Sequence, residues 1–190
     1  MNIFISGGCK NGKSLHAQEL AKEMADEQHV PLYYIATMIP ADDEDRLRIK
    51  KHLEARDGWG FITVEKPVHL MGMFENDFRD ENGDPVDPHG AFLLDSVTAL
   101  LSNEMFLPDW EFNAEAHLKV EQELTKLCKW VKNIVLVSDF IYSDAGLYDD
   151  YTECYRSGLA WCDRKLVEIS DLVVELCSGN LIVHKGELPQ

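Results

Sequence analysis

Hydrophobic and polar residues follow two alternating patterns along this chain. Short runs such as residues 91–94 and 134–137 are apolar throughout, which is typical of strands that are buried on both faces. Between such runs, apolar residues recur every three or four positions, as in residues 17–25 and 118–131, and this spacing predicts amphipathic helices. Strands and helices in alternation predict an α/β fold with a largely parallel sheet covered on both sides.

The hydrophobic pattern predicts seven strands and five helices along the chain. Leu47 is the expected apolar anchor of the second helix, and Asn113 is the expected N-cap of the fourth. Residues 75–90 are rich in Asn, Asp, Gly and Pro, which predicts a loop. We expect strands at residues 2–6, 31–37, 61–65, 91–95, 133–139, 171–176 and 181–184, and helices at residues 13–28, 42–56, 97–106, 114–131 and 155–169.

The last two predicted strands differ from the others in their connection. Only Ser178, Gly179 and Asn180 form the turn between them, which is too short for a crossover between parallel strands. We therefore expect an antiparallel hairpin at one edge of the sheet. The length of 190 residues, with this single pattern throughout, predicts one domain over residues 1–190.

The charge balance restricts the partners of the protein. Lys and Arg number 18 against 34 Asp and Glu, and the formal net charge of −16 argues against binding to nucleic acid or to anionic membranes. No apolar run approaches the length of a membrane span, and the first residues lack the features of a signal peptide. The five cysteines include no C-x-x-C pair, which predicts reduced thiols in a cytoplasmic protein.

A phosphate-binding motif stands between the first predicted strand and the first predicted helix. Its glycines let backbone N–H groups surround a phosphate, and the helix N-terminus adds positive potential. We expect Lys13 at an exposed helix start, where it bridges the β- and γ-phosphates, and the Ser14 hydroxyl on Mg²⁺. The motif predicts a P-loop NTPase-like three-layer sandwich that binds GTP or ATP. The pattern G-x-x-x-x-G-K-S is matched by Gly7, Gly8, Cys9, Lys10, Asn11, Gly12, Lys13 and Ser14.

Two aspartates end buried strands and compete for the metal. Asp95 follows the apolar run 91–94, the position from which P-loop proteins hold Mg²⁺ or its water. A strand-end aspartate that caps the next helix, Val97–Phe106, has the same sequence pattern, and the two roles are compatible. Asp139 ends the following strand. We favour Asp95 for the metal, together with Ser14, and interpret Asp139 as a turn residue.

A basic stripe lies in the second predicted helix. Arg48, His52 and Arg56 recur every four residues and so share one helical face. A histidine between two guanidinium groups is kept neutral near pH 7 and is then nucleophilic, and the arginines suit an adjacent phosphate. The same stripe is typical of a solvated, salt-bridged face, and the residues alone favour that interpretation.

Several motifs in combination resemble one enzyme family. The helix motif R-I-x-x-H-x-x-x-R, at residues 48–56, is the most specific of them when it follows a P-loop. The chain thereby resembles the bifunctional adenosylcobinamide kinase / adenosylcobinamide-phosphate guanylyltransferase. The matching motifs after the P-loop are, in order, Tyr34-Ile35-Ala36-Thr37, Asp43-Glu44, residues 48–56, Trp59, Glu65, Leu93-Leu94-Asp95-Ser96 and Ser102-Asn103-Glu104-Met105-Phe106.

The resemblance implies a defined chemistry. Members of that family phosphorylate the aminopropanol hydroxyl of adenosylcobinamide with a nucleoside triphosphate, in cobalamin biosynthesis. They then transfer GMP from GTP to that phosphate through a GMP–histidine intermediate, and they assemble as trimers. The family's histidine falls on His52. The nucleotide contacts that the resemblance implies are the P-loop and Ala36, Thr37, Met38, Leu53, Glu54, Ala55, Arg56, Glu65 and Asp95.

The C-terminal half departs from the family's usual sequence. Residues 138–146 stand in place of the run N-E-V-G-x-G-I-V-P, and Ala160–Arg164 in place of G-x-x-N-Q. Met38 replaces a small polar residue and Asp57 a proline. Three functions therefore stay open: the bifunctional corrinoid enzyme, a P-loop kinase or NTPase with another acceptor and an inert His52, and a nucleotide-binding regulatory protein without turnover.

Overall fold

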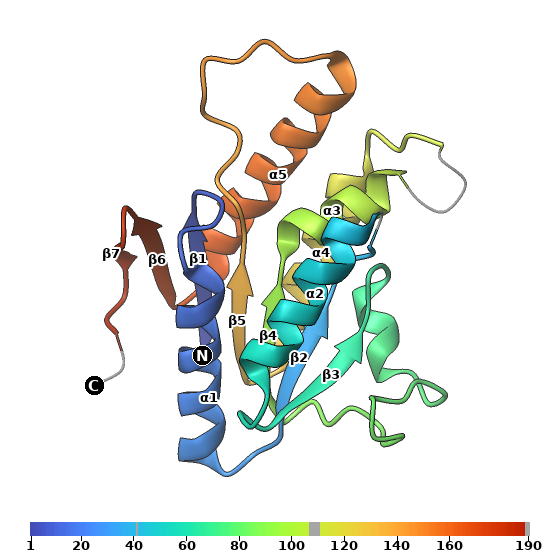
Figure 1. Cartoon of the computed structure of the whole chain (residues 1–190), viewed down its shortest axis with the longest axis vertical. Coiled ribbons are helices and arrows are strands. Elements are labelled where there is room, and N and C mark those ends of the chain that lie inside the picture. Colours follow the sequence, from blue (N-terminus) through green and yellow to red (C-terminus); the bar gives the residue numbers. More distant parts are fainter. Residues whose placement is uncertain (41, 107–110, 189–190) are drawn as a thin grey trace.

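The protein is built on one mixed sheet that runs through the molecule (Figure 1). The structure, a computed structural model, describes residues 1–40, 42–106 and 111–188, and in helix α2 it does not extend to the side chains at 45, 48, 52 and 55. The described strands stand in the order β3-β2-β4-β5-β1-β6-β7. They are β1 (Asn2–Gly7), β2 (Leu32–Ala36), β3 (Phe61–Glu65), β4 (Ala91–Asp95), β5 (Asn133–Val137), β6 (Leu172–Cys177) and β7 (Asn180–Lys185).

The strand directions confirm the fold class that the sequence predicts. Strands β1 to β6 pair in parallel, and β7 pairs antiparallel with β6, so that the predicted C-terminal hairpin forms one edge. Parallel neighbours need crossovers, and the helices provide them. The helices are α1 (Lys13–Gln28), α2 (Asp43–Arg56), a 3-10 turn η1 (Leu70–Phe74), α3 (Val97–Phe106), α4 (Ala116–Trp130) and α5 (Asp150–Ile169).

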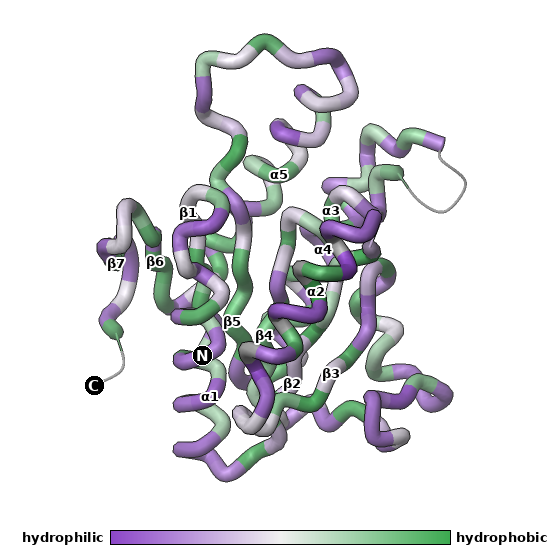
Figure 2. Tube along the Cα trace, in the orientation of Figure 1, coloured by the Kyte–Doolittle hydropathy of each residue, from purple (hydrophilic) through white to green (hydrophobic). Residues whose placement is uncertain are grey.

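Alternate residues of each central strand enter different cores on the two faces of the sheet. Ile3 and Ile5 of β1 pack with α1 on one face, whereas Phe4 packs on the other face with α3, α4 and α5. Figure 2 shows the hydrophobic central strands against hydrophilic outer turns of α1 and α2. Both faces of the central strands are therefore buried, which explains why their sequences are apolar throughout rather than alternating.

Three local predictions differ from the structure. Asn113 is not the N-cap of α4: the cap position is Glu115, and the side chain of Asn113, two residues earlier, accepts a hydrogen bond from the Glu115 N–H. Leu47 is not an apolar anchor, because 52% of it is exposed on the outer side of α2. The sequence pattern also missed η1, since Glu104 and Glu123 hold its backbone through hydrogen bonds from His69 and Leu70.

The parallel arrangement brings the carboxyl ends of β1, β2, β4 and β5 to one edge of the sheet. In open α/β sheets ligands bind outside these ends. The P-loop follows β1, Thr37 follows β2, Asp95 ends β4, and Asp139 follows β5. In the part of the chain that the structure describes, no helix is long and apolar enough to span a membrane.

Behind this edge, α5 contributes a buried acid. Asp163 is 3% exposed, and its Oδ2 accepts hydrogen bonds from the hydroxyls of Ser138 and Tyr142, both 3.0 Å away. Its other oxygen, Oδ1, is buried without a hydrogen-bond partner among the described residues. Burial raises the pKa of Asp163 to about 7, because removal from water disfavours the charged form.

The raised pKa predicts a pH-dependent stability. Below about pH 4 Asp163 is protonated in both states, and its contribution to stability is fully present. It is lost progressively as the pH rises from about 4 to about 7, because over this range the unfolded chain ionises this group and the folded chain does not. The free energy of unfolding of the wild type, minus that of Asp163→Asn, is expected to fall by about 1–3 kcal/mol between pH 4 and pH 8.

Urea unfolding at both pH values measures this difference. Asp57→Asn, at an exposed position in the turn after α2, is the matched control, and its difference from the wild type is expected to stay constant. A wild-type minus Asp163→Asn difference that does not change with pH would show that folding does not raise the pKa of Asp163.

Candidate nucleotide-binding site

The P-loop has a backbone that requires glycine at its first position. Gly7 has a φ of +149°, and a Cβ atom there would lie 2.4 Å from the carbonyl oxygen of Leu176 on β6. Gly12, with a φ of +93°, turns the chain into α1, which begins at Lys13. Gly8, Cys9 and Lys10 are exposed at the top of the loop. The loop thus follows the path, strand to turn to helix, that the phosphate-binding motif needs.

Asn11 connects the loop to the neighbouring strand. Its Nδ2 donates to the carbonyl oxygen of Leu176 over 2.6 Å, and its Oδ1 accepts from the backbone N–H of Lys13 over 3.2 Å. The side chain that we expected to contact nucleotide is therefore directed into the protein. Its structural effect is to fix the P-loop against β6.

Lys13 is buried, contrary to the expectation of an exposed helix start. Only 5% of it is exposed, and its Nζ donates to the carbonyl oxygen of Gly8 (2.6 Å), to Asn11 Oδ1 (3.3 Å) and to Asp139 Oδ1 (2.9 Å). Burial of an ammonium group is compatible with the fold because all three N–H donors have acceptors and one acceptor is a carboxylate. The loop and the tip of β5 together enclose this cation.

The two strand-end aspartates have different partners. Asp139 forms the ion pair with Lys13, so its interpretation as only a turn residue is wrong. Asp95 Oδ2 accepts a 3.3 Å hydrogen bond from the Tyr34 hydroxyl, and its side chain is partly exposed. Asp95 therefore remains accessible from the cavity, whereas one oxygen of Asp139 is occupied by Lys13.

A cavity of about 480 Å³ opens between α2 and the carboxyl ends of the strands. Its lining combines the start of α1, the ends of β2, β3 and β4, the tip of β5 and one side of α2. Of the residues expected to bind nucleotide or metal, those that line the cavity are Ser14, Ala36, Met38, Leu53, Arg56, Glu65 and Asp95. Asp139, Tyr34, Thr98 and Ile49 line it as well.

Arg56 at the end of α2 is buried against the sheet. Its guanidinium carbon lies 3.4 Å from the centre of the Tyr34 ring, a cation–π contact. Burial and the nearby Asp95 carboxylate raise the pKa of Tyr34, so that its hydroxyl remains a hydrogen-bond donor. The expectation of a solvated face thus fails at Arg56. The side chains of Arg48 and His52 lie outside the described residues, although the backbone of both is helical.

Of the expected P-loop contacts only Ser14 lines the cavity, and residues 7–13 do not. Outside the P-loop, three expected nucleotide contacts do not line the cavity or cannot be assessed. Glu54 is exposed and lies 3.8 Å from Lys50 on the outer side of α2. The side chain of Ala55 is outside the described residues. Thr37 is fully buried: its hydroxyl donates to the Ser96 carbonyl oxygen and accepts from the Ser96 N–H.

Thr37 is part of a brace between β2 and α3. The Nδ2 of Asn103 on α3 donates to the carbonyl oxygens of Thr37 (2.7 Å) and Pro67 (3.0 Å). These bonds fix the ends of β2 and β3 relative to the turn that follows Asp95. Thr37 and Asn103 therefore position the floor of the cavity.

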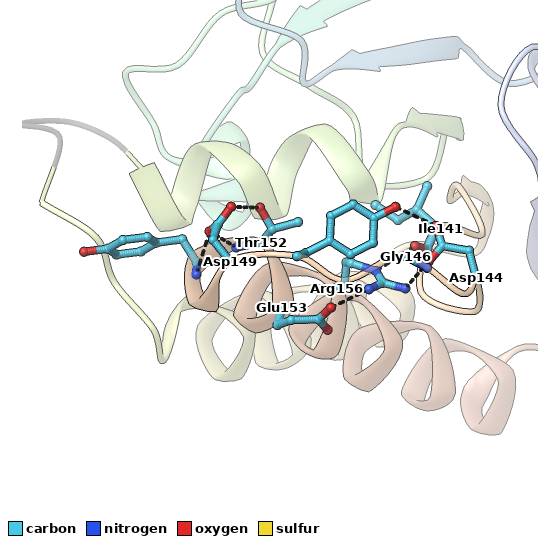
Figure 3. Close-up of polar contacts among 9 residues, drawn as sticks. Ile141, Asp144, Gly146, Asp149, Thr152, Glu153 and Arg156 are labelled. Carbon is cyan, nitrogen blue, oxygen red and sulfur yellow. Dashed lines mark hydrogen bonds and ion pairs between the residues drawn. The ribbon is translucent and has the colours of Figure 1, made fainter.

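The segment between β5 and α5 is organised by Arg156 (Figure 3). This buried arginine donates from Nε to the Ile141 carbonyl oxygen (3.0 Å), from Nη2 to Asp144 Oδ1 (2.8 Å) and from Nη1 to Glu153 Oε1 (2.6 Å). The ring of Tyr148 covers its guanidinium group, with the ring centre at 4.4 Å. Arg156 thus ties the segment 141–148, which overlaps the replaced family motif at residues 138–146, to α5.

Asp149 completes that segment as the N-cap of α5. Its Oδ1 accepts from the backbone N–H groups of Tyr151 and Thr152, each at 3.0 Å. These hydrogen bonds lower the pKa of Asp149, because they stabilise the carboxylate. The cap satisfies helix donors that have no partner within α5.

A protein-family model matches nearly the whole length of the chain. The family model described as "Cobinamide kinase / cobinamide phosphate guanyltransferase" matches residues 3–183. The chain belongs to this family. The match includes the C-terminal half, in which several usual motifs of the cobinamide kinase / cobinamide phosphate guanyltransferase family are altered.

Curated relatives support the assignment to this family. The chain is 33% identical over 150 residues to the "Bifunctional adenosylcobalamin biosynthesis protein CobU" of Escherichia coli (strain K12), and the alignment covers 73% of this chain and 75% of that protein. It is 25% identical over 189 residues to the "Bifunctional adenosylcobalamin biosynthesis protein CobP" of Pseudomonas aeruginosa, with 98% of this chain and 99% of that protein covered.

Among solved structures the "ATPase Domain of G40P" has a similar fold. Its TM-score is 0.55 at 11% sequence identity, and the match covers 97% of this chain and 76% of that one. The likeness supports the P-loop NTPase-like fold of this member of the cobinamide kinase family.

Removal of the buried cation is expected to affect binding and stability together. Lys13→Ala leaves Asp139 without its ion-pair partner, which is expected to lower the free energy of unfolding by about 1–3 kcal/mol. Because Lys13 is the P-loop lysine, the variant is also expected to lose nucleotide-dependent turnover. Urea unfolding and a coupled turnover assay measure the two effects, with Lys126→Ala, at an exposed position on α4, as control. Full turnover in folded Lys13→Ala would contradict the nucleotide-binding role.

Arg156 provides a separate test of how the β5–α5 segment is held. Arg156→Met removes three hydrogen bonds while it keeps much of the side-chain volume, and it is expected to cost about 1–3 kcal/mol of stability. Limited proteolysis is expected to cut faster within residues 140–149. Arg164→Met, at an exposed position on the same helix, is the control and is expected to match the wild type. Equal cleavage of both variants would mean that Arg156 does not hold the segment.

Proposed function

We propose that this protein phosphorylates cobinamide with a nucleoside triphosphate and then transfers GMP from GTP to the phosphate formed, in adenosylcobalamin biosynthesis. The observation that carries the proposal is a cavity lined by Ser14 of the P-loop, by Asp95 at the end of β4 and by Arg56 of helix α2. The family match supports both activities. The acceptor of the first step is the aminopropanol hydroxyl of adenosylcobinamide, as the resemblance implies.

Lys13 and Arg56 are the proposed cationic contacts of the phosphates. Lys13 binds the β- and γ-phosphates, and the backbone N–H groups of the P-loop surround them. Arg56 lines the cavity from α2, where its guanidinium group suits the α-phosphate or the base-proximal part of the nucleotide. In this proposal the triphosphate lies along the carboxyl ends of β1, β5 and β4.

Mg²⁺ is the metal that this cavity suits. Ser14 and Asp95 both line it and offer oxygen ligands, which Mg²⁺ prefers, and this cation commonly takes only one or two protein ligands beside the phosphates. The described residues contain no cluster of three His, Cys, Asp or Glu side chains that resembles a complete metal cage. When bound, Mg²⁺ neutralises charge on the β- and γ-phosphates. Ser14 and Asp95 would hold it between the P-loop and β4.

His52 is the proposed nucleophile of the second activity. Ile49 and Arg56, three residues before it and four after it on α2, both line the cavity, so the helix passes along the cavity at this position. A ring nitrogen of His52 attacks the α-phosphorus of GTP, and the bond to the β-phosphate breaks to release pyrophosphate. The phosphate of cobinamide phosphate then displaces the histidine.

The proposal includes the domain organisation, the compartment and the oligomeric state of the protein. The protein acts as one domain over residues 1–190, in the cytoplasm, as a homotrimer. All five cysteines are unpaired, which is compatible with a reducing compartment. The trimer rests on the family resemblance. Thr37, Glu54 and Ala55 stay in the proposed nucleotide-binding set only through that resemblance.

A covalent adduct tests the His52 proposal. Incubation with α-labelled GTP is expected to leave acid-labile, base-stable GMP on the wild-type chain in a denaturing gel, since phosphoramidates have that stability. The label is expected to be absent from His52→Ala, while cobinamide phosphorylation survives. His16→Ala, on α1 near the P-loop, is the matched control and is expected to label normally.

Each other outcome contradicts a defined part of the proposal. Label on His52→Ala would exclude His52 as the nucleophile. Phosphorylation without any adduct in the wild type would leave a P-loop kinase alone. Binding of GTP without either reaction would favour a regulatory nucleotide-binding protein.

A further inference from the structure

The hydrogen-bonding capacity of Lys13 is fully used within the protein. An ammonium group has three N–H donors, and Lys13 Nζ has three acceptors: the Gly8 carbonyl oxygen, Asn11 Oδ1 and Asp139 Oδ1. A phosphate oxygen that binds Lys13 must therefore take the place of one of them. The carbonyl and the amide are neutral and belong to the P-loop itself, whereas Asp139 carries a negative charge that a phosphate repels.

Asp139 is thus the partner that an incoming phosphate displaces. The backbone of Asp139 is anchored, because its N–H donates to Thr98 Oγ1 over 2.9 Å. Its backbone stays in place while the side chain, 21% exposed, is released toward the cavity that it lines. A free carboxylate then remains beside the phosphate that Lys13 binds.

The position of β5 in the sheet decides where this carboxylate lies. Strand β5 stands between β1, which leads into the P-loop, and β4, which ends in Asp95. Val137 is level with both Ile5 and Asp95, so Asp139 lies two residues further toward the carboxyl edge of the sheet. Asp139 is therefore between the P-loop and the proposed metal ligand, where the γ-phosphate is transferred.

We propose that Asp139 is the catalytic base of the phosphoryl transfer, an inference that rests on the proposed kinase activity. The acceptor hydroxyl oxygen forms a bond to the γ-phosphorus of the nucleotide. The bond between the γ-phosphorus and the β,γ-bridging oxygen breaks, and its electron pair leaves with the nucleoside diphosphate. The hydroxyl proton moves to a carboxylate oxygen of Asp139, which later returns it to water.

The other carboxylates of the cavity suit this role less well. Asp95 accepts a hydrogen bond from Tyr34 and is the proposed ligand of Mg²⁺, which would occupy its remaining oxygen. Glu65 ends β3 at the far edge of the sheet, with β2, β4 and β5 between it and the P-loop strand. Among the described acids that line the cavity, Asp139 alone contacts the phosphate-binding lysine.

The test compares Asp139→Asn with the wild type in four measurements. We expect kcat for cobinamide phosphorylation to fall about 100-fold or more, as for loss of a general base. The Kd of the nucleotide is expected to stay equal or to become tighter, because the competing carboxylate is gone. GMP labelling with GTP is expected to stay within about threefold of the wild type, and the acidic limb of the kinase pH–rate profile is expected to disappear.

A conservative variant separates catalysis from folding. Asp139→Glu keeps a carboxylate and is expected to retain the acidic limb at a reduced kcat, and circular dichroism checks that both variants fold. If Asp139 served only to position Lys13, nucleotide affinity, GMP labelling and kinase turnover would all fall together and the pH profile would keep its shape. That result, or more than a tenth of wild-type kcat in Asp139→Asn, would overturn the proposal.

Hydrolysis of GTP by water keeps this test independent of the acceptor. Water loses a proton in the same way as the hydroxyl, so slow hydrolysis without cobinamide is expected to fall in Asp139→Asn as well. A wild type that hydrolyses GTP but does not phosphorylate cobinamide would refute the proposed kinase function. The hydrolysis rates of the two proteins would still decide whether Asp139 is the base.

Discussion

A buried ammonium group must have an acceptor for each of its protons, and this requirement organises the site around Lys13. The three acceptors come from the P-loop and from the tip of β5, segments more than 120 residues apart in the sequence. Because water is largely excluded, loss of any acceptor leaves a donor unsatisfied in a medium of low polarity. The conformation of the P-loop, the register of β5 against β1 and the burial of Lys13 therefore depend on one another.

The rest of the cavity is rigid for a different reason. Thr37 and Asn103 are short polar side chains that bond backbone groups of neighbouring segments, which fixes the strand ends without large apolar contacts. Helix α2, in contrast, exposes most of its described side chains and reaches the sheet through Arg56 on Tyr34. The floor of the cavity is thus held by several hydrogen bonds, whereas the described side chains of the helix above it make few contacts with the sheet.

The fold and the P-loop were predictable from sequence because they depend on local patterns. The hydrophobic periodicity, the lengths of the apolar runs and the positions of glycine depend only on residues close together in the sequence. They predicted β1, α1 and the C-terminal hairpin correctly. The partners of Lys13, Thr37 and Arg56 were not predictable, since each lies in a segment distant in the chain. Asp139 was visible as a strand-end acid, but only the strand order places it beside Lys13. Arg156 gave no signal at all, because its partners form an irregular segment.

The close approach of Gly7 to Leu176 has a consequence for how the molecule is divided. Strand β6 supplies the carbonyl oxygen against which Gly7 packs and to which Asn11 bonds, so the end of the chain forms part of the wall of a site that begins at its start. An N-terminal fragment that contains the entire P-loop motif would lack that wall. Phosphate binding here is a property of the assembled sheet, and it cannot be transplanted with the motif alone.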